Sequence, residues 1–280
     1  MAAPFPTGDS PNSWRVADWA ELRALAAAPF KRGDLKVGIA NEDVKNPDLL
    51  EEQVWEELAR RAALPEWPMQ FDGNVLVPRA RMRNRSLYRY FLLLGLGEAI
   101  DNTDRRRFEE LIVLLLAPLV GGPLLRVGAP AHPVGTASFS ERIDAYFAAA
   151  SIADDERGQQ LPATDQDLGL DVVGWFSFND GRGGDLHVWA QCATGHDWEQ
   201  KLTDLSWNVW QSHADLGVQP VRVFATPLAL TISTLKWKRH SKDAGLILDR
   251  FRLMQLAEVS GFPRKESNLL ARRFDELVDA

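Results

Sequence analysis

Two polar residues stand inside apolar segments of the chain, where their side chains can do chemistry. Asp171 opens the run "DVVGWFSF", and Gln191 lies late in the run "DLHVWAQCA". Both side chains carry oxygen atoms, the ligands that hard divalent cations such as Mg²⁺ prefer. A cation held by oxygens can stabilise the charge that develops during phosphodiester hydrolysis and can activate a water molecule. The pair therefore indicates a metal-assisted hydrolytic site as one hypothesis.

The segments around these residues predict that the two side chains are neighbours. The two β-rich runs are separated by "NDGRGG", a polar, glycine-rich turn that is typical of a hairpin. We assume that Phe178 faces Asp185 across this turn. Antiparallel counting then brings residues 171–172 opposite residues 191–192. The register itself stays open, because a slip of one residue exchanges the two faces of a strand.

The rest of residues 101–227 predicts alternating helices and strands. A helix begins at Thr103 or Asp104 and stops at Gly121, and a short strand "LLRVG" follows. The next expected elements are the helix "SFSERIDAYFAAASI", an exposed loop over residues 153–167, the hairpin, the helix "HDWEQKLTDLSWNVWQSHA" and the strand "VRVFATP". This order predicts a mixed α/β domain.

This region resembles the PD-(D/E)XK, or restriction-endonuclease-like, superfamily, and especially its Mrr-type branch. The segments "RRFEELIVLLLAPLVGG", "GLD" and "VWAQCA" stand in the matching order, and the resemblance covers roughly residues 104–227. It implies an α/β (α+β) restriction-endonuclease-like core, with a mixed central sheet flanked by helices. It also implies that Asp171, Gln191 and Glu109 hold Mg²⁺ or Mn²⁺.

One position departs from the family pattern. The lysine expected two residues after Gln191 is replaced by Ala193. In some members of the family a site residue moves to the following helix, so the resemblance makes Lys201 the natural substitute. Glu199, its neighbour, could lend a further carboxylate.

Each of these residues also has an ordinary structural explanation. Asp171 can cap a turn, and Gln191 can be a core amide with satisfied hydrogen bonds. Glu109 and Glu110 lie early in a helix, where acids favour the helix dipole. Lys201 can be a solvated lysine on a helix.

Composition excludes several other classes of protein. The 280 residues hold one cysteine, Cys192, which we expect in the core, and five histidines without metal-ligand spacing, so a zinc hydrolase is not predicted. "GRGG" lacks the lysine and hydroxyl residue of a nucleotide loop. The start of the chain lacks the pattern of a secretory signal, and no apolar run is long enough for a membrane, so we expect a cytoplasmic protein.

The formal charge of −7 argues against a general coat for nucleic acids, but residues 79–85, 105–107 and 236–242 are locally basic. The ten tryptophans are expected to pack in the core. We expect two domains, a mostly helical unit over residues 1–100 and a nuclease domain over residues 101–280 with a helical C-terminal extension.

These inferences predict a Mg²⁺-dependent endodeoxyribonuclease that acts on DNA, in restriction or anti-phage defence. Its catalytic residues would be Asp171, Gln191, Lys201 and Glu109. An alternative is an inactive nuclease-fold module that binds DNA or a protein partner of a defence complex, and Ala193 favours that alternative. A scaffold that touches no nucleic acid is a third hypothesis. A homo-oligomer is compatible with each, and a membrane partner is not expected.

Overall fold

The chain divides into two compact units. The structure is a computed structural model that describes residues 5–6, 12–27, 29–42, 44–64, 67–97, 101–128, 138–152, 157–158, 161 and 168–279. Unit 1 comprises Met1–Ala99, Pro227–Thr231 and Asp249–Ala280, and unit 2 comprises Ile100–Thr226 and Ile232–Leu248. Most of the loop predicted over residues 153–167 lies outside the described residues. No helix among the described residues combines the length and the apolar character that a membrane crossing requires.

Unit 1 contains six helices and a small sheet among its described residues. The helices are α1 (Ser13–Ala27), α2 (Arg32–Ala40), α3 (Pro47–Ala62), α4 (Arg85–Leu96), α9 (Arg250–Ser260) and α10 (Arg264–Asp279), and the strands β1 (Phe30–Lys31), β2 (Met69–Phe71) and β3 (Val75–Pro78) pair in the order β1-β3-β2. The amino-terminal region is mostly helical, and α9 and α10 group with it rather than with residues 101–248.

A buried ionic cluster explains why α9 belongs to unit 1. The Arg250 guanidinium donates to both carboxylate oxygens of Asp18 on α1, at 2.8 and 2.6 Å. Arg61 on α3 also donates to Asp18, at 2.5 Å, and to Glu21, at 2.7 Å. These four side chains are fully buried. A charge this deep must be paired to be tolerated, so the cluster fixes α9 to α1 and α3. Sequence periodicity carries no signal of such a long-range pairing.

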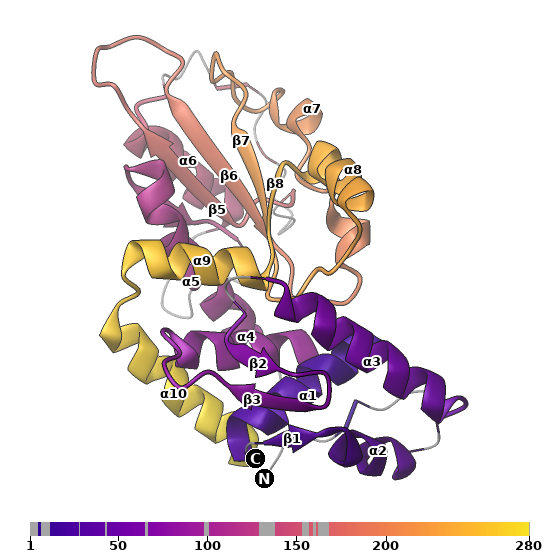
Figure 1. The fold of residues 1–280 in the computed structure, drawn as a ribbon. Coiled ribbons are helices and arrows are strands. Elements are labelled where there is room, and N and C mark those ends of the chain that lie inside the picture. Colours follow the sequence, from indigo (N-terminus) through magenta and orange to yellow (C-terminus); the bar gives the residue numbers. More distant parts are fainter. Residues whose placement is uncertain are drawn as a thin grey trace. The chain divides into compact units, whose positions relative to one another are not determined.

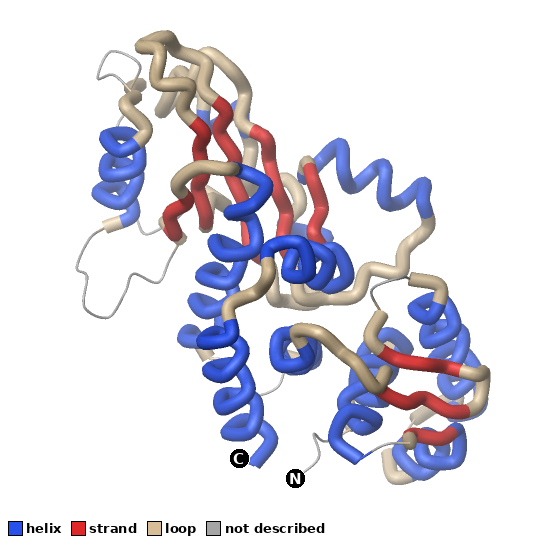
Figure 2. Tube along the Cα trace, turned by 60° about the vertical axis from the view of Figure 1, so that its left-hand side comes forward, coloured by secondary structure: helices blue, strands red, loops and turns tan. Residues whose placement is uncertain are grey.

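Unit 2 is built around a five-stranded mixed sheet. Its strands are β4 (Leu124–Arg126), β5 (Val172–Phe176), β6 (Leu186–Cys192), β7 (Val221–Ala225) and β8 (Leu246–Leu248), in the order β4-β5-β6-β7-β8. The pairs β4·β5 and β5·β6 are antiparallel, whereas β6·β7 and β7·β8 are parallel. Figure 1 shows β5 to β8 side by side, and Figure 2 shows the strands from a second direction. The predicted mixed α/β class is confirmed at this level.

The helices of unit 2 include the predicted α5 (Asn102–Val120) and α6 (Phe139–Ala149), and α8 (Thr234–Ala244) follows β7. Asp101 caps α5, because its side chain accepts from the backbone of Thr103 and Asp104. The hairpin β5–β6 is present as predicted, but it pairs Val172 with Ala190, a register one residue away from the assumed one.

The core of unit 2 is rich in aromatic side chains. Trp175, Trp189 and Trp210 are buried against α6, which confirms packing as their role. The Tyr146 hydroxyl lies 2.7 Å from His187 Nδ1 and accepts from Trp189 Nε1 at 3.1 Å. Burial lowers the pKa of His187, because desolvation disfavours the charged ring by more than the nearby Asp185 carboxylate favours it.

Two predicted helices are wrong in part. The segment after β6 forms only a short 3-10 helix, η2 (Trp198–Lys201), and the four-residue α7 (Trp207–Trp210). Residues 202–206 between them do not continue the helix: the Asp204 N–H donates to the Lys201 carbonyl, and the Ser206 N–H donates to the Asp204 carbonyl. The second is the helix that the run "LILDRFRLMQLAEV" predicts from Leu246 onward. Residues 246–248 instead pair with β7 as β8, and Asp249 caps α9.

Candidate functional site

One cavity of unit 2 is lined by all four residues selected from the sequence. It has a volume of about 460 Å³, and Glu109, Asp171, Gln191 and Lys201 all contribute to its wall. The remaining lining residues come from α5, from the residues before β5 and from the segment that follows β6: Asn102, Arg105, Phe108, Gly169, Cys192, Thr194, Gly195, Asp197 and Asp204. The fold of unit 2 therefore brings together residues that lie almost a hundred positions apart in the chain.

Asp171 is fixed at the start of the hairpin by its backbone and by its side chain. Its N–H donates to the Ala190 carbonyl at 2.9 Å, and its carbonyl accepts from Val127 and Gly128 at 2.7 and 3.0 Å. The carboxylate accepts from the Cys192 N–H at 2.6 Å, and only 7% of the residue is exposed. The predicted proximity of Asp171 to the end of β6 is therefore present. Asp171 does more than cap a turn, because its carboxylate joins two strands at the wall of a cavity.

Gly128 leaves room for two carboxylates at the same point. A Cβ atom on this residue would lie 2.5 Å from Asp171 Oδ1 and 2.9 Å from Glu109 Oε2. Both distances are shorter than van der Waals contact allows. The absence of a side chain at residue 128 is therefore what allows the acids of α5 and of β5 to approach each other.

Glu109 is buried and is paired with a cation. It is 5% exposed, and its Oε2 lies 2.6 Å from Arg126 Nε on β4. The helix dipole alone does not explain this residue, because Glu109 points from α5 onto the sheet, where Arg126 neutralises it. Glu110, by contrast, forms its ion pairs with Arg106 and Arg107 on the helix surface.

Gln191 is a buried amide with a carboxylate partner. Its Nε2 donates to Asp204 Oδ2 at 3.4 Å, and 5% of the residue is exposed. Gly169 supports this arrangement, because its φ of +74° and its close approach to the Asp204–Leu205 backbone would strain any other residue. An amide that donates through its nitrogen keeps its carbonyl oxygen for a cation or a polar ligand.

Lys201 lies at the end of η2 and lines the cavity. Its side chain is 41% exposed, and its Nζ lies 4.0 Å from Asp197 Oδ1. Ala193, at the position of the expected lysine, is buried and carries no amine. Glu199 does not line the cavity, because it pairs with Lys236 on α8 at 2.6 Å. Lys201 is therefore the lysine that lines this wall, although it stands on a 3-10 turn rather than on the predicted helix.

Sequence reasoning missed several residues of the cavity wall. Arg105, Asp197 and Asp204 are charged residues in polar segments, where the sequence gives no signal of a site. Cys192 was expected in the core, yet it is only half buried and lines the cavity. Polar residues inside apolar strands were detectable, whereas ordinary charged residues were not.

The charges of the wall suit a cation better than an isolated anion. Four carboxylates line the cavity, on Glu109, Asp171, Asp197 and Asp204, with the cations Arg105 and Lys201. No group of three or more His, Cys, Asp or Glu side chains with metal-holding geometry occurs among the described residues. Mg²⁺ does not require such a group, because it is usually held by one or two carboxylates, water and substrate phosphates. The oxygens around Gly128 fit that mode of binding.

Comparison with models of known families, with curated proteins and with solved structures found no match.

Proposed function

We propose that the protein is a metal-dependent nuclease of the restriction-endonuclease-like type, which hydrolyses phosphodiester bonds of DNA. One observation carries the proposal: Glu109, Asp171 and Gln191, selected by motif order, and Lys201, selected as the substitute for the missing lysine, all line one cavity. The resemblance over residues 104–227 adds the fold and the reaction type. On that resemblance alone we place the activity in restriction or anti-phage defence.

In this proposal Asp171 and the Gln191 carbonyl hold Mg²⁺ or Mn²⁺ at the wall beside Gly128. The bound cation would supply charge stabilisation to the phosphate and would lower the pKa of a water molecule. Asp171 is positioned for this role because the Cys192 N–H orients its carboxylate. Asp204 holds the Gln191 amide by its nitrogen, and thereby selects the carbonyl oxygen for the ligand.

Glu109 acts as the accessory acid of the site. Its ion pair with Arg126 restrains the carboxylate beside Asp171 and reduces the repulsion between the two acids. This arrangement lowers the cost of placing two carboxylates against Gly128, since like charges in a buried site destabilise each other.

Lys201 and Arg105 supply the positive charge of the wall. A phosphodiester is repelled by the four carboxylates unless cations face it, and these two side chains line the same cavity. Lys201 polarises the attacking water or the scissile phosphate. Its exposure of 41% leaves it able to move toward a substrate, and Asp197 holds it only loosely.

A cleavage assay tests the proposal. Plasmid and linear DNA are incubated with the full chain and Mg²⁺ or Mn²⁺, and the assay is repeated with Asp171→Ala and Lys201→Ala. We expect cleavage to require the metal ion. The cleavage rate should fall by about 100-fold or more in Asp171→Ala, because the removal of a group that acts on the reacting atoms commonly lowers the rate by this factor. Lys36→Ala on α2 is the matched control, since Lys36 is exposed and lies in unit 1. Cleavage at the wild-type rate in both site variants would contradict the assignment of Asp171 and Lys201 to the active site.

A specific observation favours a second function, an inactive nuclease-fold module that binds DNA or a protein. Ala193 is buried where the family places its lysine, and Arg126 already neutralises Glu109. Salt-sensitive DNA binding without cleavage under any metal would support this module. A stable protein complex without DNA binding would support the scaffold instead.

A further inference from the structure

Helix α8 presents a basic surface on an acidic protein. Four of its eleven residues are lysine or arginine, at positions 236, 238, 239 and 242, against the single acid Asp243. The whole chain carries a formal charge of −7. Helix α8 is therefore one of the segments where positive charge is dense, beside residues 79–85 and 105–107, and a dense basic surface attracts anionic partners.

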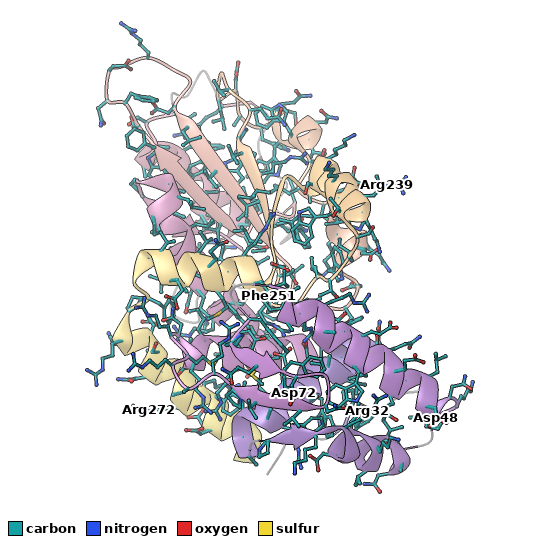
Figure 3. All side chains as sticks on the ribbon, in the orientation of Figure 1. Arg32, Asp48, Asp72, Arg239, Phe251 and Arg272 are labelled. Carbon is teal, nitrogen blue, oxygen red and sulfur yellow. The ribbon has the colours of Figure 1, made fainter. Side chains whose placement is uncertain are left out.

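The charged residues form one stripe along the helix. Lys238, Arg239 and Lys242 are exposed and follow helical spacing with Leu235, which is 80% exposed. The opposite side of α8 packs on the domain through His240 and Ala244, which are buried. Figure 3 shows the Arg239 side chain projecting outward from the helix. We name Lys238, Arg239 and Lys242 the α8 stripe.

The helix that carries the α8 stripe is attached directly to the segment that carries Lys201. Lys236 Nζ pairs with Glu199 Oε1 at 2.6 Å, and the Trp198 and His240 rings meet edge to face with centroids 5.4 Å apart. Glu199 and Trp198 belong to η2, and Lys201 at its end lines the candidate cavity. A polyanion that reaches Lys201 therefore passes close to α8.

We infer that the α8 stripe binds the phosphate backbone of the DNA duplex that flanks the bond at the cavity. This inference rests on the proposed function, because it takes the same DNA as its partner. The cavity wall carries more carboxylates than cations, so the site itself contributes little attraction for a polyanion. Three exposed cations on a rigid helix supply that attraction, and they do so without reading sequence.

The test is a salt titration of DNA binding. Binding of a short fluorescein-labelled duplex to the full chain is measured by anisotropy, without divalent cations, over a range of salt concentrations. The variant combines Lys238→Ala, Arg239→Ala and Lys242→Ala. We expect the affinity of this variant for the duplex at low salt to fall by about 10-fold or more. The plot of log affinity against log salt should become less steep by about 2 to 3, because each phosphate contact contributes about 0.9 to the magnitude of that slope.

A second triple variant controls for net charge. Arg264, Lys265 and Arg272 are exposed on α10 in unit 1, and changing them to alanine removes the same charge. We expect this control to bind DNA as the wild type does. Equal losses in the two triple variants, or an unchanged slope in the α8 variant, would overturn the inference. Binding of an acidic protein rather than the duplex through the α8 stripe would overturn it as well.

The two failures are distinguishable. If the stripe controls binding but no metal supports Asp171-dependent cleavage, the proposed nuclease activity fails and the α8 surface stands. If cleavage depends on Asp171 while the α8 variant binds and cuts like the wild type, the surface fails and the activity stands. Circular dichroism of both triple variants confirms folding, which we expect because all six side chains are exposed.

Discussion

The two units both bury acidic side chains, but the surroundings of these acids differ. In unit 1, Asp18 accepts from both Arg61 and Arg250, and all three side chains have no exposed surface. In unit 2, Asp171 and Glu109 are nearly as buried, yet both line a cavity, and the cation Lys201 on its wall is 41% exposed. The first group is closed by its own partners, whereas the second faces space that a ligand can enter.

This difference separates a structural cluster from a candidate reactive site. Burial alone would raise the pKa of Asp18, but Arg250 and Arg61 outweigh it and hold that pKa below its ordinary value. Burial alone would lower the pKa of Arg61, and Asp18, Glu21 and Glu57 instead raise it well above its ordinary value. Asp18 and Arg61 are thus both held in their ionised forms. A buried acid is a candidate for chemistry where it lines a cavity that a ligand can enter, as Asp171 and Glu109 do.

The largest expected effect comes from breaking the unit 1 cluster. Arg61→Ala leaves Asp18, Glu21 and Glu57 with too little positive charge, because Arg61 is bonded to all three. We expect the free energy of unfolding to fall by roughly 3–5 kcal/mol, as when one partner of a buried pair is removed. Urea unfolding followed by circular dichroism measures it. Arg60→Ala, whose side chain is 55% exposed, is the control and should change stability by less than about 0.5 kcal/mol. A similar small change for Arg61→Ala would refute the structural role of the cluster.

A smaller effect is expected at the cavity, where function rather than stability should respond. Gly128→Ala places a methyl group against the carboxylates of Asp171 and Glu109, so both must shift. We expect the affinity for Mn²⁺ and the cleavage rate to fall by about 10- to 100-fold, as for displaced supports of metal ligands. Isothermal titration with Mn²⁺ and the cleavage assay measure these two quantities. Gly33→Ala meets no atom within 4 Å and serves as the control. Unchanged metal affinity in Gly128→Ala would argue against a cation at the wall beside Gly128.

A third aspartate, Asp249 in unit 1, should make the stability of the protein depend on pH in the direction opposite to Asp18. Burial raises the pKa of Asp249, because the backbone donors of Arg252 and Leu230 and the nearby arginines compensate only in part. The folded pKa thus lies above the unfolded one, so the ionised form costs stability at neutral pH. That cost disappears as the pH falls through the folded pKa toward the unfolded value. Relative to Asp249→Asn, the wild type should therefore gain stability as the pH falls from 7 toward 4.

Urea unfolding of both proteins at several pH values measures this slope. The change in the unfolding free energy over this pH range should be smaller than the loss expected for Arg61→Ala. Asp18 would give the opposite slope, because its folded pKa is lowered and its stabilisation is lost as the pH falls through that value. A difference between wild type and Asp249→Asn that does not vary with pH would show that burial does not perturb Asp249.

The fold was predictable where local pattern and tertiary packing agree. The hairpin β5–β6 was predictable from two β-rich runs around a glycine-rich turn. The helix α5 was predictable from the acids near its start and from Gly121 at its end, although its cap is Asp101 rather than Thr103 or Asp104. Prediction failed after β6, because Trp198, Leu202 and Leu205 repeat at helical spacing but are buried by a turn rather than by a helix. It also failed at β8, whose burial depends on parallel pairing with β7 far away in the chain.

The candidate site was predictable for a related reason. Asp171 and Gln191 stand out because a polar residue in an apolar strand requires a partner, and the structure supplies one to each. Gly128 and Arg105 gave no such signal, since their contribution depends on which elements meet at the cavity. The register of the hairpin was also beyond prediction, because a six-residue turn does not fix it.

The smallest expected effect concerns the ion pair that joins α8 to η2. Lys236 and Glu199 are both exposed by more than 40%, and such pairs contribute about 0–1 kcal/mol, so Lys236→Ala should lower the unfolding free energy by less than about 1 kcal/mol. Cleavage should change little as well, because the contact of Trp198 with His240 still holds η2 against α8. Urea unfolding and the cleavage assay measure the two effects, with Lys36→Ala as the control. A loss of activity as large as that of Lys201→Ala would mean that the ion pair, rather than packing, positions the lysine of the cavity.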